Sequence, residues 1–233
     1  MAEFLENMPM ILPAVLMGAV IPLAVILYLA ISPARKKVYF PMIFFGFAAF
    51  FASLVLVGVA LLILAQSLLA SISVSASDGD QVVMIGGCIV LLAFYLFTEL
   101  LRFFSYKTGL KKEEKNRFGG LLFGAGFLLA QDLLIFGIAA TGELSLSQAL
   151  GFGVLMLICG AIYLLISEIG YRTAEEGHPF VGGAIASVYF ILLAVMLVFA
   201  SVVVTYIFVG LALAFSLLMG YLLLPQKKRG EEA

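Results

Sequence analysis

The stretch Phe180–Leu224 reads FVGGAIASVYFILLAVMLVFASVVVTYIFVGLALAFSLLMGYLLL and contains no charged residue. A transmembrane helix crosses the hydrocarbon core of a bilayer in about 20 apolar residues. This stretch is therefore too long for one span and has the length of two. Its least apolar point is Ser201–Tyr206, where β-branched residues stand with Ser and Thr. We predict a tight turn there, between spans at about 180–201 and 205–224.

Five further apolar segments precede this stretch, and each is long enough to cross a bilayer. Their predicted bounds are about 10–32, 40–66, 81–104, 118–140 and 146–170. Glu3 and Glu6 stand where a signal peptide would carry positive charge, so we expect the first segment to remain as a span. The sequence thus predicts an all-α, polytopic membrane protein with a single seven-helix domain over residues 1–233.

The composition agrees with a membrane protein. Hydrophobic residues make up 64% of the chain, charged residues only 12%, and the mean hydropathy is +1.20. Soluble domains are near half apolar and a quarter charged, so lipid is the expected partner of this surface. The net charge of −1 gives no indication of nucleic-acid binding. Cys88 and Cys159 fall inside apolar segments without a CxxC motif, and we interpret them as small buried residues.

The basic residues set the predicted topology. Cytoplasmic loops of membrane proteins carry an excess of Lys and Arg. With seven spans, all 13 Lys and Arg residues lie on one side, including the clusters at 35–37, 102–117 and 227–229. Six spans would place the last cluster on the opposite side. We therefore predict an outer N-terminus and a cytoplasmic C-terminus, in the plasma membrane of a prokaryote or an endomembrane of a eukaryote.

Three acidic residues lie inside the predicted spans, where charges are costly and mark functional candidates. Glu99 stands three residues before Arg102, and Glu168 four residues before Arg172, so each can form an ion pair along its helix. We interpret the Glu168 pair as an anchor at the end of its span. For Glu99 and Arg102, an anchor and an active role both remain open.

Asp132 lies near the middle of the fourth predicted span, next to Gln131, with no basic residue at that depth in any span. Such a carboxyl must be protonated or hydrogen-bonded to a neighbouring helix. It is either a polar clamp between helices or a site for a proton or cation, and we favour the clamp.

Gly120 and Gly124 open the fourth span with a GxxxG pattern, which lets another helix backbone approach closely. We predict that they pack against a helix, within this chain or in a partner.

Recognised catalytic motifs are absent from the sequence. Its only histidine, His178, precedes Pro179, so no HExxH zinc motif and no paired haem ligands exist. The sequence also lacks a GxSxG motif, a second aspartate at bilayer depth, and a lysine in Phe180–Leu224 for a Schiff base. We expect no cofactor, no metal site and no catalytic residues, while transport stays open because it needs only a few polar groups.

The segment Glu99-Leu-Leu-Arg102-Phe103-Phe-Ser-Tyr106-Lys107 resembles the end of the third span in the anterior-pharynx-defective subunit of gamma-secretase, Glu-x-x-Arg-Phe-x-x-Tyr-Lys. Four other elements fall in the same order as in that family: Pro33-Ala-Arg35, Gly46, Ser53-Leu54, and Gly120 with Gly124. The chain is also similar to the bacterial YhfC-like membrane proteins, relatives of the CAAX-type intramembrane proteases. The resemblance implies seven spans and partnership with another integral membrane protein, such as an intramembrane protease.

The chain departs from both families at the positions that carry chemistry. Its fifth and sixth spans contain no histidine, where the gamma-secretase subunit has one in each. Thr98 replaces the second carboxylate of the protease-like relatives, and Gly124-Ala-Gly126-Phe127 lacks their histidine. Metal-dependent proteolysis therefore does not follow from the resemblance.

These observations predict a non-catalytic membrane scaffold or assembly subunit. A small-molecule or ion transporter using Asp132 and Gln131 is the alternative. A divergent YhfC-like or CAAX-like protease without its histidines is the third hypothesis.

Overall fold

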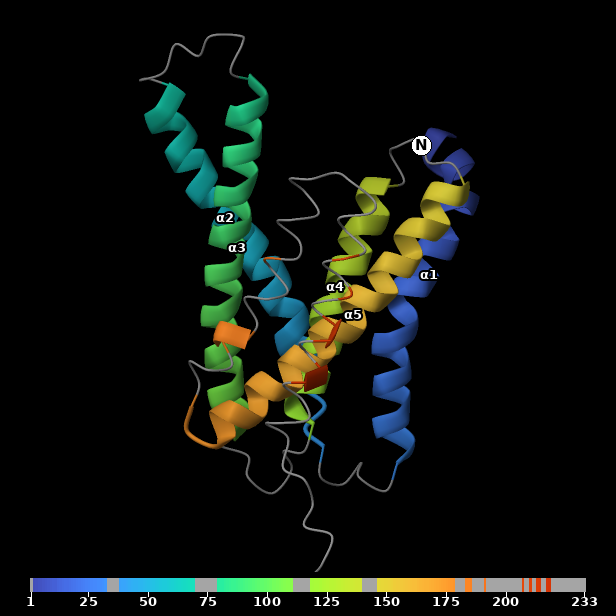
Figure 1. Ribbon diagram of the computed structural model, residues 1–233, viewed down its shortest axis with the longest axis vertical. Helices are drawn as coiled ribbons and strands as arrows, with labels where there is room; N and C mark the ends of the chain where they lie inside the picture. The colour runs from blue at the N-terminus through green and yellow to red at the C-terminus, as the bar shows by residue number, and fades with distance from the viewer. Residues whose placement is uncertain are drawn as a thin grey trace, which may run out of the picture.

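The computed structural model describes residues 2–32, 38–69, 79–110, 118–139 and 146–178, together with short pieces between 183 and 218. These residues form five α-helices and, within these ranges, no strand. The helices are α1 (Ala2–Ile31), α2 (Met42–Leu69), α3 (Gly79–Leu110), α4 (Gly119–Ala139) and α5 (Leu146–Glu175). Figure 1 shows them as one bundle of long, inclined helices.

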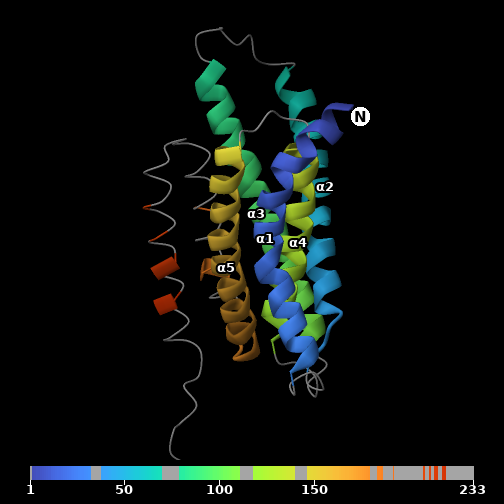
Figure 2. The same ribbon diagram turned by 90° about the vertical axis from the view of Figure 1, so that its right-hand side faces the viewer.

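Helix α4 lies at the centre of the bundle. It packs along α1, α2 and α5, while α3 packs chiefly along α2 (Figure 1). Helix α1 also runs along α5. Figure 2, turned by 90° from Figure 1, shows α1, α4 and α2 side by side. A helix placed in this way is covered on most of its circumference, and α4 is buried almost continuously from Gly119 to Leu128.

Three described helical segments are long and apolar enough to cross a membrane: Met42–Ala60, Ile89–Thr108 and Gly153–Glu175. Two shorter apolar segments, Leu16–Ile31 and Gly119–Ile135, accompany them. Their outward faces carry large apolar side chains such as Leu16, Leu27 and Leu96. Exposing such apolar surfaces to water is unfavourable, whereas the hydrocarbon core of a bilayer accommodates them. The all-helical fold of the described residues, with these three apolar helices, is compatible with a helical membrane protein.

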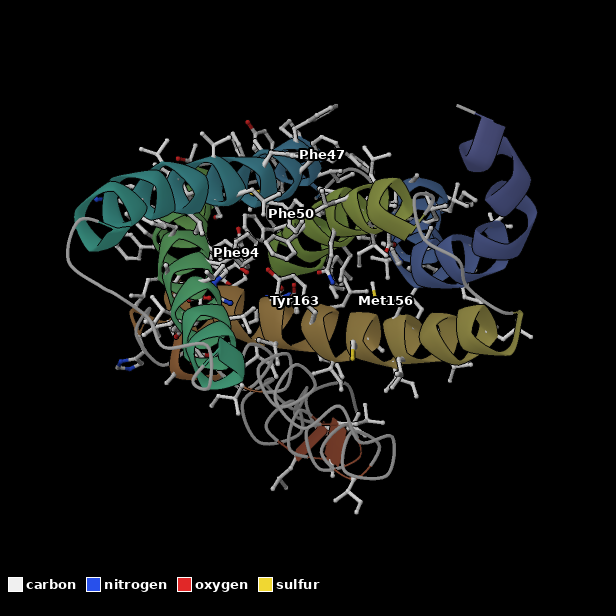
Figure 3. The ribbon with its side chains drawn as sticks, turned by 90° about the horizontal axis from the view of Figure 1, so that it is seen from above. Phe47, Phe50, Phe94, Met156 and Tyr163 are labelled. Atoms are coloured by element: carbon white, nitrogen blue, oxygen red, sulfur yellow. The ribbon has the colours of Figure 1, made fainter. Side chains whose placement is uncertain are left out.

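An aromatic cluster fills the interior between α2, α3, α4 and α5. Phe50 contacts Phe94 and Phe127 edge to face, with ring centroids 5.7 and 5.1 Å apart, and Phe127 stacks on Tyr163 at 4.7 Å. Figure 3 shows Phe50, Phe94 and Tyr163 turned toward this interior from three different helices. Such aromatic pairs contribute stability in addition to that from the apolar area they bury.

The observed helices follow the first five predicted spans but extend beyond several of them. Helix α1 begins at Ala2, and α3 continues to Leu110, six residues past the predicted end of its span at 104. Helix α5 continues to Glu175 instead of residue 170. Hydropathy indicates where a helix leaves the lipid. The helix itself can continue into water for as long as its backbone hydrogen bonds are formed. The predicted spans 180–201 and 205–224 lie almost wholly outside the described residues.

Helix α5 ends in a Schellman motif. Gly177 has a positive φ of 87°, which a residue without Cβ adopts at little cost. The backbone N–H of His178 donates to the carbonyl of Thr173, and that of Gly177 to Ala174. These two bonds satisfy carbonyls at the helix end, and they place His178 on the exposed surface.

Candidate functional site

The polar and glycine residues singled out in the sequence lie on α3, α4 and α5, along the central helix and its neighbours. Helices α2 and α4 approach each other closely. A Cβ on Gly46 of α2 would lie 2.8 Å from the carbonyl carbon of Phe123, and one on Gly126 of α4 would lie 2.8 Å from that of Ile43. Real Cβ atoms do not come this close to backbone, so both positions require glycine. The two helices are therefore in backbone-to-backbone contact.

The opposite side of α4 lies equally close to α5. A Cβ on Gly120 would lie 2.6 Å from the Cα of Glu168, and one on Gly124 would lie 3.0 Å from Oγ of Ser167. Gly119 faces the ring of Tyr171. The helix that packs on the GxxxG pattern is thus α5 of the same chain, which answers a question that the sequence left open.

Glu168 connects α5 to the start of α4. Its Oε2 accepts the backbone N–H of Leu121 at 3.1 Å, and its Oε1 accepts Nε of Arg172 at 2.9 Å. The first N–H groups of a helix have no partner within the helix, and a carboxylate is favoured there by the helix dipole. Glu168 therefore caps α4 as well as pairing with Arg172, a role that spacing alone does not show.

Glu99 and Arg102 form the ion pair on α3 that their spacing indicates, between Oε2 and Nη2. Arg102 is 3% exposed, and its Cζ lies 5.6 Å from the ring centre of Tyr106, a cation–π contact. Tyr106 in turn donates its hydroxyl to the carbonyl of Ser167 at 2.8 Å. The pair is therefore tied to α5 through one aromatic side chain.

Two hydrogen bonds hold the middle of α3. Thr98 donates to Oγ of Ser53 on α2 at 3.0 Å, and both side chains are buried. Tyr95 donates to the carbonyl of Gly183 at 3.0 Å. Thr98 is thus engaged in helix packing.

Asp132 lies on the face of α4 that meets α1. It is 5% exposed, and a Cβ on Gly18 of α1 would lie 2.7 Å from its Oδ1. Its Oδ2 is buried and has no hydrogen-bond partner in the part of the chain that the structure describes. The predicted clamp is therefore not made through this oxygen. Gln131, the preceding residue, is partly buried.

No known protein family, curated protein or solved structure matches this chain. The resemblance to the gamma-secretase subunit and to the YhfC-like proteins stays a prediction.

Ligands for a metal do not gather among the described residues, where no three His, Cys, Asp or Glu side chains come together. Cys159 is a buried free thiol in the apolar core. Chemically, the described arrangement packs helices, neutralises buried charges in pairs, and leaves one carboxyl oxygen without a partner.

Sequence reasoning missed Gly18, the capping role of Glu168, and the bond from Tyr106 to Ser167. It noted Gly46 and Gly126 without assigning them a neighbour. Gly18 is an isolated glycine between apolar residues, and no local pattern links it to Asp132. Only the crossing of α1 and α4 does so.

Proposed function

We propose that the protein is a non-catalytic integral membrane scaffold, with seven spans, an outer N-terminus and a cytoplasmic C-terminus. The three described helices that can cross a membrane support the membrane location. The collection of all 13 Lys and Arg residues on one side supports seven spans over six. The resemblance to the gamma-secretase subunit favours another integral membrane protein as the partner.

One observation carries the proposal, the packing of α4. Gly46 and Gly126 bring it against α2, Gly120 and Gly124 bring it against α5, and Gly18 brings it against α1. Helices in lipid associate through such close contacts, because lipid exerts no hydrophobic force between them. A centre packed in this way is suited to hold other helices in fixed positions.

The charged groups inside the bundle support the same function. Arg102 pairs with Glu99, and Arg172 with Glu168, in each case along one helix. A group that is engaged in an ion pair and in bonds to a neighbouring helix orders the structure. These pairs serve assembly without needing a substrate.

Co-purification tests the scaffold. The tagged chain is cross-linked in native membranes, solubilised in mild detergent and purified, and we expect one membrane protein in constant stoichiometry. Gly124→Leu should abolish the complex, because Gly124 lies against Ser167. Gly151→Leu is the matched control on α5, since nothing lies within 4 Å of a Cβ there. An intact complex in Gly124→Leu, or no stoichiometric partner for the native chain, would contradict the proposal.

Accessibility tests the topology. In a chain with Cys88 and Cys159 changed to Ser, single variants Asp78→Cys, Lys111→Cys and Lys227→Cys are treated with an impermeant maleimide in intact cells. We expect labelling of Asp78→Cys alone, and of the other two after permeabilisation. Labelling of Lys227→Cys from outside would exclude seven spans with this orientation.

A transporter is the second candidate. Oδ2 of Asp132, which has no hydrogen-bond partner among the described residues, favours it. Substrate flux in proteoliposomes that disappears in Asp132→Asn would support it over the scaffold. The protease hypothesis gains no comparable support, because Thr98 is bonded to Ser53. Zinc bound stoichiometrically to the purified protein would revive it.

A further inference from the structure

Asp132 differs from the other acids inside the described bundle. Glu99 and Glu168 each have an arginine within hydrogen-bonding distance, whereas Asp132 has no ion-pair partner among the described side chains. It is 5% exposed, and its Oδ2 accepts no hydrogen bond from a described residue. Burying a carboxylate without a charged partner is costly, and taking up a proton removes this cost.

The described side chains of the helices packed against α4 bring no charge to this place. Helix α2 contains no charged residue, and neither does the stretch of α1 from Leu12 to Ile31. On α5 the nearest ion pair is Glu168 with Arg172, and Glu168 bonds Leu121, which lies about 16 Å along α4 from Asp132 at 1.5 Å per residue. The titratable side chains described on these helices and on α3 are Tyr28, Tyr95, Glu99, Arg102, Tyr106, Lys107, Cys159, Tyr163, Glu168, Tyr171, Arg172 and Glu175. None of these side chains forms an ion pair with Asp132.

Gly18 makes the space that the carboxyl occupies. A Cβ at this position would lie 2.7 Å from Oδ1 and 3.1 Å from both Cγ and Oδ2 of Asp132. Glycine therefore admits the whole carboxyl group between α1 and α4, and it offers no side chain to bond with it. The niche holds a polar group without neutralising it.

We propose that Asp132, in the niche opened by Gly18, is a proton-binding site inside the bundle. A proton from water forms an O–H bond with the carboxylate, and the group becomes neutral and able to donate. A metal cation needs several oxygen ligands, and no cluster of acidic, His or Cys ligands surrounds Asp132 among the described residues. A proton needs only the one oxygen that the geometry leaves free.

This site goes beyond the scaffold function, because helix packing through glycine requires no ionisable group at this depth. The two proposals are tested separately. Proton binding is measured on the carboxyl itself and needs no partner protein. The scaffold function is measured by complex formation.

Infrared difference spectroscopy of the full chain in lipid tests the site. A protonated carboxyl has its own C=O stretching band, which disappears on deprotonation. We expect such a band near neutral pH, shifted to lower frequency when the chain is grown with 13C in the aspartate carboxyl. The chain has only three aspartates, Asp78, Asp80 and Asp132. The band should vanish in Asp132→Asn and persist in Asp78→Asn/Asp80→Asn.

The isotope measurement stands even where Asp132→Asn fails to fold. Absence of an isotope-sensitive band from the native chain would overturn the proposal, and so would a band that survives in folded Asp132→Asn. Loss of the band on replacing choline chloride with sodium chloride at fixed pH would also overturn it, in favour of a sodium site. A band indifferent to sodium supports the proton.

Gly18→Ala tests the niche. The added methyl has to displace the carboxyl, so the proton affinity read from the pH dependence of the band should differ from that of the native chain. Gly58→Ala is the control, since a Cβ there meets nothing within 4 Å. An unchanged titration in Gly18→Ala would overturn the role of the niche.

Discussion

Gly46 on α2 and Gly126 on α4 are related reciprocally, because each lies against the carbonyl group three residues before the other. Gly46 faces Phe123, and Gly126 faces Ile43. The two helices thus share one crossing. There the backbone of each helix fills the space that a side chain would need at the glycine of the other helix. Contacts of this type recur where membrane helices approach most closely.

Substitution at this crossing should separate α2 from α4. We expect Gly46→Ala and Gly126→Ala each to destabilise the protein by about 2 kcal/mol or more, the upper range of overpacking costs, because the neighbour is backbone and cannot move aside. The double variant should cost less than the sum, since both changes widen the same crossing. Unfolding of the monomer in bicelles measures the three values.

Gly58→Ala is the matched control on α2. Nothing lies within 4 Å of a Cβ at this position, so alanine should be neutral or stabilise by about 1 kcal/mol through its higher helix propensity. Equal losses for Gly58→Ala and Gly46→Ala would show that the crossing does not determine the effect.

The cap on α4 gives a second prediction. Glu168→Ala removes the acceptor for the N–H of Leu121 and leaves Arg172 without its buried partner. Losing a cap costs about 0.5–2 kcal/mol, so we expect a loss at the upper end of this range. Glu168→Gln keeps an acceptor and should lose less. Glu175→Gln, at the exposed end of the same network, should change stability by about 0.5 kcal/mol at most. A larger loss for Glu175→Gln than for Glu168→Ala would contradict the cap.

The sequence predicted the elements that depend on local pattern. Apolar length located α1 to α5, and spacing of three and four residues indicated the pairs of Glu99 with Arg102 and Glu168 with Arg172. The GxxxG pattern at Gly120 and Gly124 indicated close packing. Each of these features is contained in one helix and needs no knowledge of its neighbour.

Relationships between helices could not be predicted in this way. The contact of Gly18 with Asp132 joins residues more than a hundred positions apart, and the bond from Tyr106 to Ser167 spans 61. The ends of α3 and α5 were also missed, because they continue past the apolar segment. Bilayer hydropathy carries no information on which faces of two helices meet.

Loss of either member of the ion pair on α3 should lower the stability of the protein, but by unequal amounts. Glu99→Gln leaves the buried guanidinium of Arg102 charged and unpaired, since arginine stays protonated. We expect a loss of about 3–5 kcal/mol, the usual cost of breaking a buried pair. Arg102→Met should cost less, because Glu99 is more exposed and can take up a proton. The variant Glu99→Gln/Arg102→Met should recover most of the loss of Glu99→Gln, as measured by unfolding in bicelles. No recovery would indicate that the two side chains act independently.

The hydrogen bond from Thr98 to Ser53 gives the last prediction, since it joins two helices deep in the bundle. Thr98→Val keeps the shape of the side chain and removes the donor, and Ser53→Ala removes the acceptor. Hydrogen bonds between membrane helices contribute about 0.6 kcal/mol on average and about 1.7 at most. We therefore expect a coupling energy of about 1 kcal/mol in the double-mutant cycle of these two changes. Thr108→Val serves as the control, because the exposed Thr108 hydroxyl bonds only to Phe104 of its own helix among the described residues. Zero coupling between Thr98 and Ser53 would mean that α2 and α3 are held by apolar contacts alone, and Thr98 would then be free for another role.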